Sequence, residues 1–196
     1  MINYEKYEYS GWTLCKEAFE QLFILIRDKK LTNVLEFGSG VSTSFLKDLN
    51  INYVSFDGDS TYSAKEENVL IRPVRQATKE YYNSIIENKK SFNIEEFNKF
   101  PQILKEHTRQ KYCFYSIEDN DLVNQPFDLI LLDGPHGNGR SFAFNLIKSM
   151  LKKETYILVD DYNHYPFIDN LKIIFPKASL YFESVENCFC IYKVEI

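Results

Sequence analysis

A carboxylate stands two residues before a glycine-rich turn in the segment Val-Leu-Glu-Phe-Gly-Ser-Gly, residues 34–40. Glycine allows a ligand to approach the backbone, and the N–H groups that open the following helix point into the same space. The carboxylate of Glu36 can hold a cationic or hydroxyl-bearing ligand, whereas it would repel a pyrophosphate. We therefore expect a ligand of the adenosylmethionine type rather than a dinucleotide. The residues predicted to bind it here are Glu36, Gly38, Ser39 and Gly40.

A second acidic residue, Asp57, ends the run 51–57. Ligands of open parallel sheets bind beyond the carboxyl ends of the strands, where a carboxylate can accept both hydrogen bonds of a ribose diol. This position predicts a ribose-binding role for Asp57, with Asp59 as the alternative if the register differs. The competing interpretation is a turn, because Asp-Gly at 57–58 is also typical of a hairpin.

Asp133 ends a nearly continuous apolar run, residues 127–133, and a loop that contains His136 follows it. Both side chains can take a proton from a hydroxyl, so Asp133 and His136 are the candidate catalytic bases, and His164 is a further candidate. Asp133 is also expected to contact the cofactor. Arg140, near the start of the next helix, is predicted to be available to an anionic substrate group. The alternative is a simple connection in which Arg140 is solvated.

The adjacent carboxylates Asp160 and Asp161 end the next apolar run. Two neighbouring carboxylates repel each other unless a cation, a proton or an arginine compensates. With Asp133 they would supply oxygen ligands to a hard divalent cation such as Mg²⁺, so Asp133, Asp160 and Asp161 form a candidate metal site. In the alternative interpretation, one aspartate caps the following helix and the other faces solvent.

These side chains need elements that bring the strand ends together. Apolar periodicity predicts a leading helix, then strands that alternate with helices through parallel crossovers. The predicted fold is α/β, a Rossmann-like, doubly wound, mostly parallel seven-stranded sheet with a C-terminal antiparallel hairpin and a helical insert. The predicted strands are 34–37, 51–57, 69–74, 127–133, 156–160, 178–184 and 188–194. The predicted helices are 12–30, 42–49, 62–67, 140–151 and 166–174.

The length of 196 residues suits one well-buried domain, so we expect residues 1–196 to form a single domain. Residues 76–126 interrupt the alternation with clusters of aromatic and charged residues and no glycine. Because these aromatic side chains need something to cover, the segment predicts an inserted helical subdomain or lid. The alternative is a decorated crossover helix that extends the core.

The net charge of -5 and the pI near 5.3 argue against binding to a nucleic-acid backbone, which needs a basic field. A small-molecule or glycan substrate fits this charge better. The polar N-terminal residues show no signal peptide, and no apolar run approaches membrane-spanning length, so we expect a cytoplasmic protein without membrane contact. The spacing of the cysteines is not that of a zinc site, and the cysteines are too sparse for a disulfide scaffold. They are Cys15, Cys113, Cys188 and Cys190.

Over about residues 12–195, the insert excepted, the chain resembles a class I S-adenosylmethionine-dependent methyltransferase. Segment 35–40 is similar to the first motif of the family, Asp57 lies where its ribose-binding acid is expected, and Asp133 is similar to the acid that ends its fourth strand. The segments Glu-Phe-Gly-Ser-Gly-Val-Ser-Thr and Leu-Asp-Gly-Pro-His-Gly resemble a subgroup of sugar O-methyltransferases, such as those acting on plant glucuronoxylan.

The candidate metal site is similar to the ligand pattern of catechol-type and macrolide-sugar O-methyltransferases. It departs from the catechol type, in which asparagine usually follows the second aspartate. The resemblance implies transfer of the S-adenosylmethionine methyl group to a sugar or small-molecule hydroxyl. From the glycine turn itself we expect that a valine at Gly38 would abolish cofactor binding and leave the protein folded.

Two other functions stay open. One is a non-catalytic domain that binds an adenosyl ligand or a partner, and the other is an NAD-dependent oxidoreductase. Thr43 replaces the third glycine of a dinucleotide fingerprint, which argues against the oxidoreductase. No Asn-Pro-Pro-Tyr-like motif follows Asp133, which argues against methylation of nucleic-acid bases.

Overall fold

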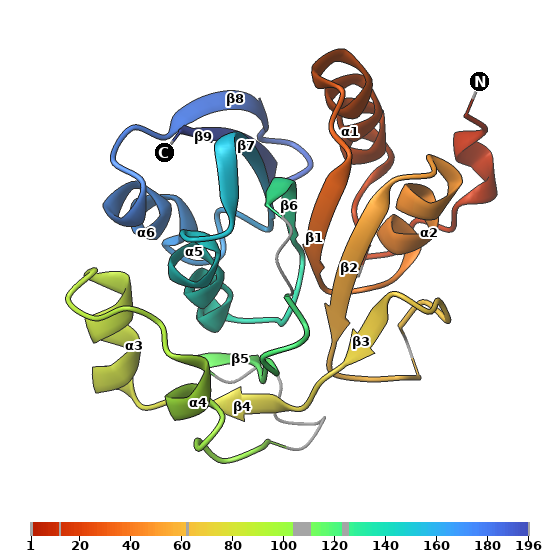
Figure 1. The fold of residues 1–196 in the computed structure, drawn as a ribbon. Helices are drawn as coiled ribbons and strands as arrows, with labels where there is room; N and C mark the ends of the chain where they lie inside the picture. The colour runs from red at the N-terminus through yellow and green to blue at the C-terminus, as the bar shows by residue number, and fades with distance from the viewer. Residues whose placement is uncertain (1, 12, 62, 104–110, 123–125, 196) are drawn as a thin grey trace.

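Seven apolar runs of the sequence form one sheet in the computed structural model, which describes residues 2–11, 13–61, 63–103, 111–122 and 126–195. Its strands are β1 (Asn33–Phe37), β2 (Asn52–Asp57), β3 (Val69–Ile71), β6 (Phe127–Leu132), β7 (Leu151–Asp160), β8 (Ser179–Ser184) and β9 (Phe189–Glu195). They lie in the order β3-β2-β1-β6-β7-β9-β8 (Figure 1). The first five are parallel, and β9 runs antiparallel between β7 and β8. The predicted mostly parallel sheet with a C-terminal antiparallel hairpin is therefore confirmed.

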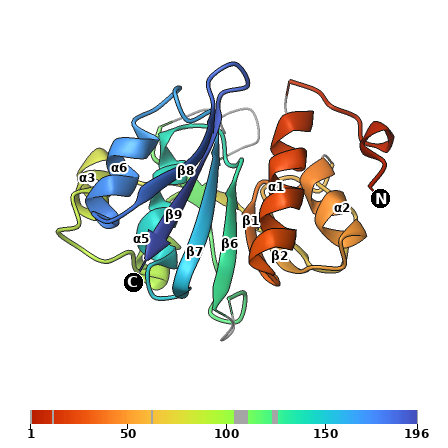
Figure 2. The same ribbon diagram turned by 90° about the horizontal axis from the view of Figure 1, so that it is seen from above.

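Helices cover both faces of this sheet. They are α1 (Lys16–Lys29), α2 (Val41–Asp48), α3 (Lys79–Ile86), α4 (Ile94–Phe97), α5 (Phe142–Ile147) and α6 (Phe167–Ile174). Short 3-10 helices span Tyr4–Lys6 and Asn138–Ser141. Figure 2 shows α1 and α2 on one side of the sheet and α3, α5 and α6 on the other. No helix in the described part of the chain is both long and apolar enough to cross a bilayer.

Alternating burial along the strands divides the core into two hydrophobic clusters. In β1, Val34 joins the cluster under α1 and α2, whereas Leu35 and Phe37 join the cluster under α5 and α6. Side chains two residues apart on a strand share a face. Glu36 therefore faces the α1 and α2 side, where Ser55, its partner on β2, lies beside it.

The strand order reverses between β1 and β6. From β1 the chain proceeds outward through α2 to β2, and it later returns to the other side of β1 with β6. The loops after these two strands therefore leave in opposite directions, and ligands of open α/β sheets bind at such a reversal, beyond the carboxyl ends of the strands. The glycine turn after β1 and the loop after β6 meet at this reversal.

The insert contributes a small second sheet and part of the main core. Strand β4 (Val74–Gln76) pairs antiparallel with β5 (Cys113–Tyr115). Side chains of α3 and α4 belong to the same hydrophobic cluster as α5 and α6, among them Tyr82, Ile85 and Phe97. This packing favours the alternative in which residues 76–126 extend the core.

Several predicted elements differ from the structure, among them the leading helix, which begins at Lys16, and the strand predicted at 156–160, which begins at Leu151. Residues 63–67 contain no helix, and the chain before them turns at Asp59, whose side chain accepts from the Thr61 N–H (2.8 Å). The predicted strand 69–74 is divided at Pro73 into β3 and β4, which join different sheets. The predicted helix 140–151 is shorter, since β7 already begins at Leu151.

Candidate active site

Glu36 lies at the centre of the site, fully buried between β1, β2 and α2. One carboxylate oxygen, Oε2, accepts hydrogen bonds from Thr43 Oγ1 (2.6 Å) and Ser55 Oγ (2.7 Å). Thr43 Oγ1 in turn accepts from the Gly40 N–H (3.0 Å). This chain of bonds ties the glycine turn and the first turn of α2 to both strands.

The second oxygen of Glu36, Oε1, is buried and has no hydrogen-bond partner among the described residues. Burial raises the pKa of Glu36 to about 7, and the hydroxyls of Ser42, Ser55 and Thr43 oppose this shift. An unpartnered buried oxygen is costly, and a donor from a ligand would satisfy it. The Glu36 side chain thus supports the turn from inside the protein. Its Oε1 is the carboxylate oxygen that has no hydrogen-bond partner among the described residues.

Gly38 is required by a close approach of two backbones. Its φ is +99°, and a Cβ at this position would lie 2.7 Å from the Gly134 nitrogen. A Cβ on Gly134 would lie 2.8 Å from the Gly38 Cα. The Gly134 N–H donates to the Phe37 carbonyl (2.6 Å). This contact argues against the expectation that valine at Gly38 would leave the fold intact, because the side chain would push the two loops apart.

Gly40 and Asp57 form the more open part of the turn. A Cβ on Gly40 would meet no atom within 4 Å. Asp57 ends β2, and its Oδ2 accepts from the Ser39 N–H (3.0 Å) and the Ser39 hydroxyl (3.2 Å), while Oδ1 accepts from the Asp59 N–H (2.8 Å). Burial raises the pKa of Asp57, and these bonds oppose the rise. The predicted ribose acid thus stands beside the glycine turn and braces it.

Asp133 and Asp160 form a pair of carboxyl groups at neighbouring strand tips. They follow Leu132 and Val159, which are paired across β6 and β7. Asp160 hydrogen-bonds to Asp133, and burial together with the Asp133 charge raises the pKa of Asp160 to about 8. Burial also raises the pKa of Asp133, against the nearby charge of Arg140. The two carboxyl groups therefore share a proton more readily than exposed carboxyl groups would, and the Arg140 charge favours the ionised form of Asp133.

Arg140 is buried beneath this pair, with 2% of its surface exposed. Its guanidinium donates to the carbonyls of Asp160 (2.8 Å), Pro135 (3.2 Å) and Leu132 (3.4 Å). The prediction that Arg140 would be available to an anionic substrate is therefore wrong. The alternative of a solvated arginine is wrong as well, since the side chain serves as an internal cation that ties the loop after β6 to β7.

The three aspartates of the candidate metal site do not form one. Among the described residues, no group of three or more His, Cys, Asp or Glu side chains is placed to hold a metal ion. Asp161 has a left-handed φ of 53° and lies 3.5 Å from His164 Nδ1, while Asp133 and Asp160 are compensated by a shared proton and by Arg140. A shared proton and Arg140 thus reduce the repulsion between these carboxylates, which the sequence analysis had expected Mg²⁺ to compensate.

Of the three histidines, His136 is the one that lies in the loop after β6, directly beyond Asp133. Its ring meets Tyr165 edge to face, with centroids 6.3 Å apart. His164 is exposed in the turn after β7. His107, in the insert, lies outside the described residues. The loop after β6 thus keeps Asp133 and His136 together as candidate bases.

Tyr115 is a site residue that the sequence analysis did not identify. Its ring stacks on Phe37 and Phe56 at the ends of β1 and β2, with centroids 6.3 Å and 6.4 Å away. Its hydroxyl lies against Gly134, and burial with the charge of Asp57 raises its pKa well above the ordinary value. Only the tertiary position of β5 shows that this phenol packs against the tips of β1 and β2 and the loop after β6.

The family comparison agrees with this geometry. The model of a methyltransferase domain matches residues 35–162, from β1 to the turn after β7. The chain belongs to this methyltransferase family. It is a class I S-adenosylmethionine-dependent methyltransferase by fold and motif, and family membership removes the NAD-dependent oxidoreductase as an alternative. No curated protein matches the chain.

Solved structures share the fold of this methyltransferase at low identity. A candidate O-methyltransferase from Klebsiella pneumoniae has a TM-score of 0.55 and 12% identity, with 98% of this chain and 86% of that chain covered. An O-methyltransferase from Bacillus cereus in complex with S-adenosylhomocysteine has a TM-score of 0.52 and 13% identity, with 95% and 84% covered. The 16S rRNA N2 G1207 methyltransferase of Thermus thermophilus has a TM-score of 0.50 and 12% identity, with 96% and 43% covered.

Proposed function

We propose that this methyltransferase transfers a methyl group to a hydroxyl of a sugar or another small molecule. The observation that carries the proposal is the meeting of the Gly38 turn with the loop of Asp133 and His136 at the reversal of strand order. Cofactor-binding and proton-accepting groups then lie on adjoining loops. The net charge of -5 supports a small acceptor over a nucleic acid.

The residues around the glycine turn fit the cofactor. Gly40 leaves open space at the start of α2, Asp57 stands at the tip of β2 for the ribose, and Glu36 Oε1 is a buried oxygen without a partner among the described residues. When bound, S-adenosylmethionine supplies an electrophilic sulfonium methyl group. In this proposal Glu36, Gly38, Ser39 and Gly40 shape its site, with Gly38 acting through its contact with the loop after β6.

The chain's contribution to the reaction is alignment and removal of one proton. An acceptor hydroxyl held at near-attack distance needs a base for its proton. Asp133 is suited to this role because burial raises its pKa, the Arg140 charge favours its ionised form, and the raised pKa of Asp160 lets that neighbour hold a proton. His136 is the second candidate, on the same loop. Tyr115, neutral and buried, keeps water from the strand tips.

Binding of S-adenosylhomocysteine tests the cofactor site. We expect calorimetry to detect binding of S-adenosylhomocysteine and none of NAD. Gly40→Val should weaken this binding by about tenfold or more, roughly 1.4 kcal/mol or above, because the new side chain enters the space left for the ligand. Gly11→Val is the control, since a Cβ on Gly11 also meets nothing within 4 Å, and Gly11 lies outside the turn.

The same titration, combined with an assay of methyl transfer, distinguishes the remaining alternatives. Absence of S-adenosylhomocysteine binding by the folded protein would contradict the proposed site. Binding without methyl transfer to any hydroxyl, in a panel of sugars and phenols, would favour a non-catalytic adenosyl-binding domain. Methylation of RNA in preference to small molecules would contradict the proposed acceptor class.

A further inference from the structure

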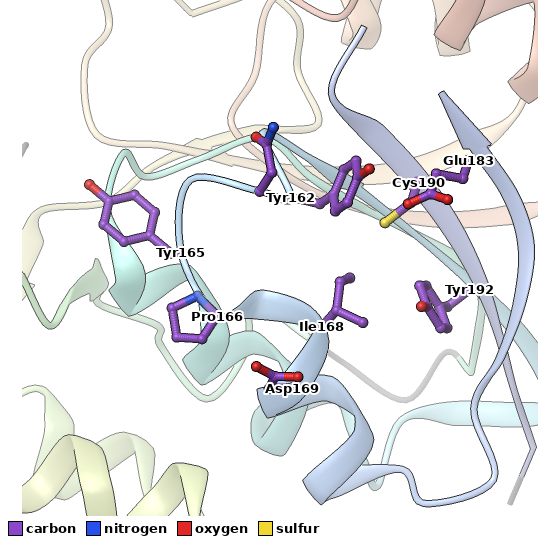
Figure 3. A pocket seen from close by; sticks show the side chains of 9 residues that line it. Tyr162, Tyr165, Pro166, Ile168, Asp169, Glu183, Cys190 and Tyr192 are labelled. Atoms are coloured by element: carbon purple, nitrogen blue, oxygen red, sulfur yellow. The ribbon is translucent and has the colours of Figure 1, made fainter. Parts of the chain in front are cut away.

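A cavity of about 240 Å³ opens beside the carboxyl end of β7, between α6 and strands β8 and β9. Figure 3 shows side chains of α6 and the preceding loop facing those of β8 and β9 across it. Ile168 and the buried residues Cys190 and Tyr192 lie in its wall, and the exposed carboxylates Asp169 and Glu183 also line it. None of the residues proposed to bind the cofactor lines this cavity.

The cavity adjoins the loop that carries the candidate bases. Tyr165, which lines the cavity, packs edge to face on His136. Cys190, on the opposite side, is paired with Val159 of β7, the residue before Asp160. The cavity therefore lies at the same end of the sheet as the candidate bases.

The chemistry of the lining is aromatic and anionic. Tyr162, Tyr165 and Tyr192 offer ring faces or hydroxyls, and the Tyr162 hydroxyl donates to Glu183. No lysine, arginine or histidine is among the described residues that line the cavity. One of these rings already has an ammonium group near it, since Lys172 Nζ lies 5.9 Å from the centroid of Tyr192.

We infer that this cavity binds an ammonium group carried by the methyl acceptor. A cation gains from the ring faces and from the carboxylates of Asp169 and Glu183, a neutral group gains less, and an anion is repelled. The volume lies below the roughly 300–1,000 Å³ of sites for drug-sized ligands, so a single ring fits better than an extended molecule. The inference rests on the proposed function only in calling the ligand a methyl acceptor.

Three sugars with the same ring size test whether the cavity prefers a cationic, a neutral or an anionic ligand. Glucosamine, glucose and glucuronate are cationic, neutral and anionic at about pH 6, and saturation-transfer NMR measures their binding without any turnover. We expect glucosamine to bind most tightly and glucuronate most weakly, and we expect added salt to reduce the difference. Glucose binding equal to that of glucosamine, or a preference for glucuronate, would overturn the inference.

Substitution of the carboxylates tests the location. The double variant Asp169→Asn with Glu183→Gln should weaken glucosamine binding by roughly threefold to tenfold and leave glucose binding unchanged. Glu186→Gln is the matched control, because this exposed carboxylate on the β8–β9 turn does not line the cavity. Unchanged glucosamine binding in the double variant would overturn the assignment. If the wild-type protein does not bind S-adenosylhomocysteine in calorimetry, the proposed function is contradicted. The sugar measurements would then still decide whether the cavity binds an ammonium group.

Discussion

Individual side chains in this protein acquire their chemistry from burial. Asp160 and Glu36 hold protons near neutral pH because each lies in the interior, next to other acidic groups. Arg140 also lies in the interior. It donates to the Asp160 carbonyl there, and its positive charge offsets the carboxylates at the strand ends. These residues therefore report the electrostatics of the site through the pH dependence of stability.

Replacement of Asp160 by asparagine tests the shared proton. The pKa of Asp160 is about 8 in the folded protein and 3.8 ordinarily, so the folded state binds more protons between about pH 4 and 8. The stabilisation that this group provides is fully present below about pH 4 and is lost as the pH rises toward 8. Asp160→Asn keeps a donor toward Asp133 and removes the titration. We expect its melting temperature to fall less than that of the wild type between pH 5 and 8.

Thermal melts at several pH values measure this difference. A change of 1 kcal/mol corresponds to roughly 2–4 °C for a chain of this size. Glu186→Gln, which removes an exposed carboxylate, should keep the wild-type pH profile. Parallel profiles for Asp160→Asn and the wild type would show that Asp160 does not hold the shared proton.

Among the elements, the turn after β1 and the loop after β6 depend on each other. Their glycines touch through the backbone, and Tyr115 of β5 rests on the same contact. We expect Gly38→Ala to lower the free energy of unfolding by roughly 2 kcal/mol or more, because it adds a clash to a left-handed φ. Urea denaturation measures this loss.

Gly11→Ala controls for the general effect of replacing glycine, since its Cβ meets no atom within 4 Å. Its free energy of unfolding should stay within about 0.5 kcal/mol of the wild type or rise slightly. Equal stability of the Gly38 and Gly11 variants would contradict the close backbone approach.

The sequence predicted the elements that are determined by local pattern. The central strands β1, β2 and β6 agree with their predicted bounds to within one or two residues, because their apolar runs end at Asp or Gly. The helix expected at 62–67 is wrong because local bonds of Asp59 compete with helix formation. The roles of Tyr115 and Arg140 depend on contacts between strands far apart in sequence, which periodicity does not encode.

At the scale of the whole molecule, the insert and the sheet share one hydrophobic cluster. Phe97 of α4 is 1% exposed, and its ring lies 5.0 Å from that of Phe92 and 5.3 Å from that of Phe142 in α5. We expect Phe97→Ala to lower the free energy of unfolding by about 3–5 kcal/mol within a single transition. Denaturation followed by near- and far-ultraviolet circular dichroism measures it.

Ile173→Ala provides the control for this prediction, because Ile173 is a large apolar residue with 44% exposure. Its effect should be below about 1 kcal/mol. A separate early transition in Phe97→Ala, with the main transition unshifted, would indicate that residues 76–126 form an independent lid.

The contact between Gly38 and Gly134 also limits how this sequence can change. When a bulky residue enters an ordinary core, a smaller partner can compensate for it. Here both partners already lack a side chain, so a larger residue at either position has no direct compensating replacement in the other. We therefore expect substitutions that change the choice of acceptor to occur in the walls of the cavity between α6, β8 and β9. We do not expect them at the contact between Gly38 and Gly134.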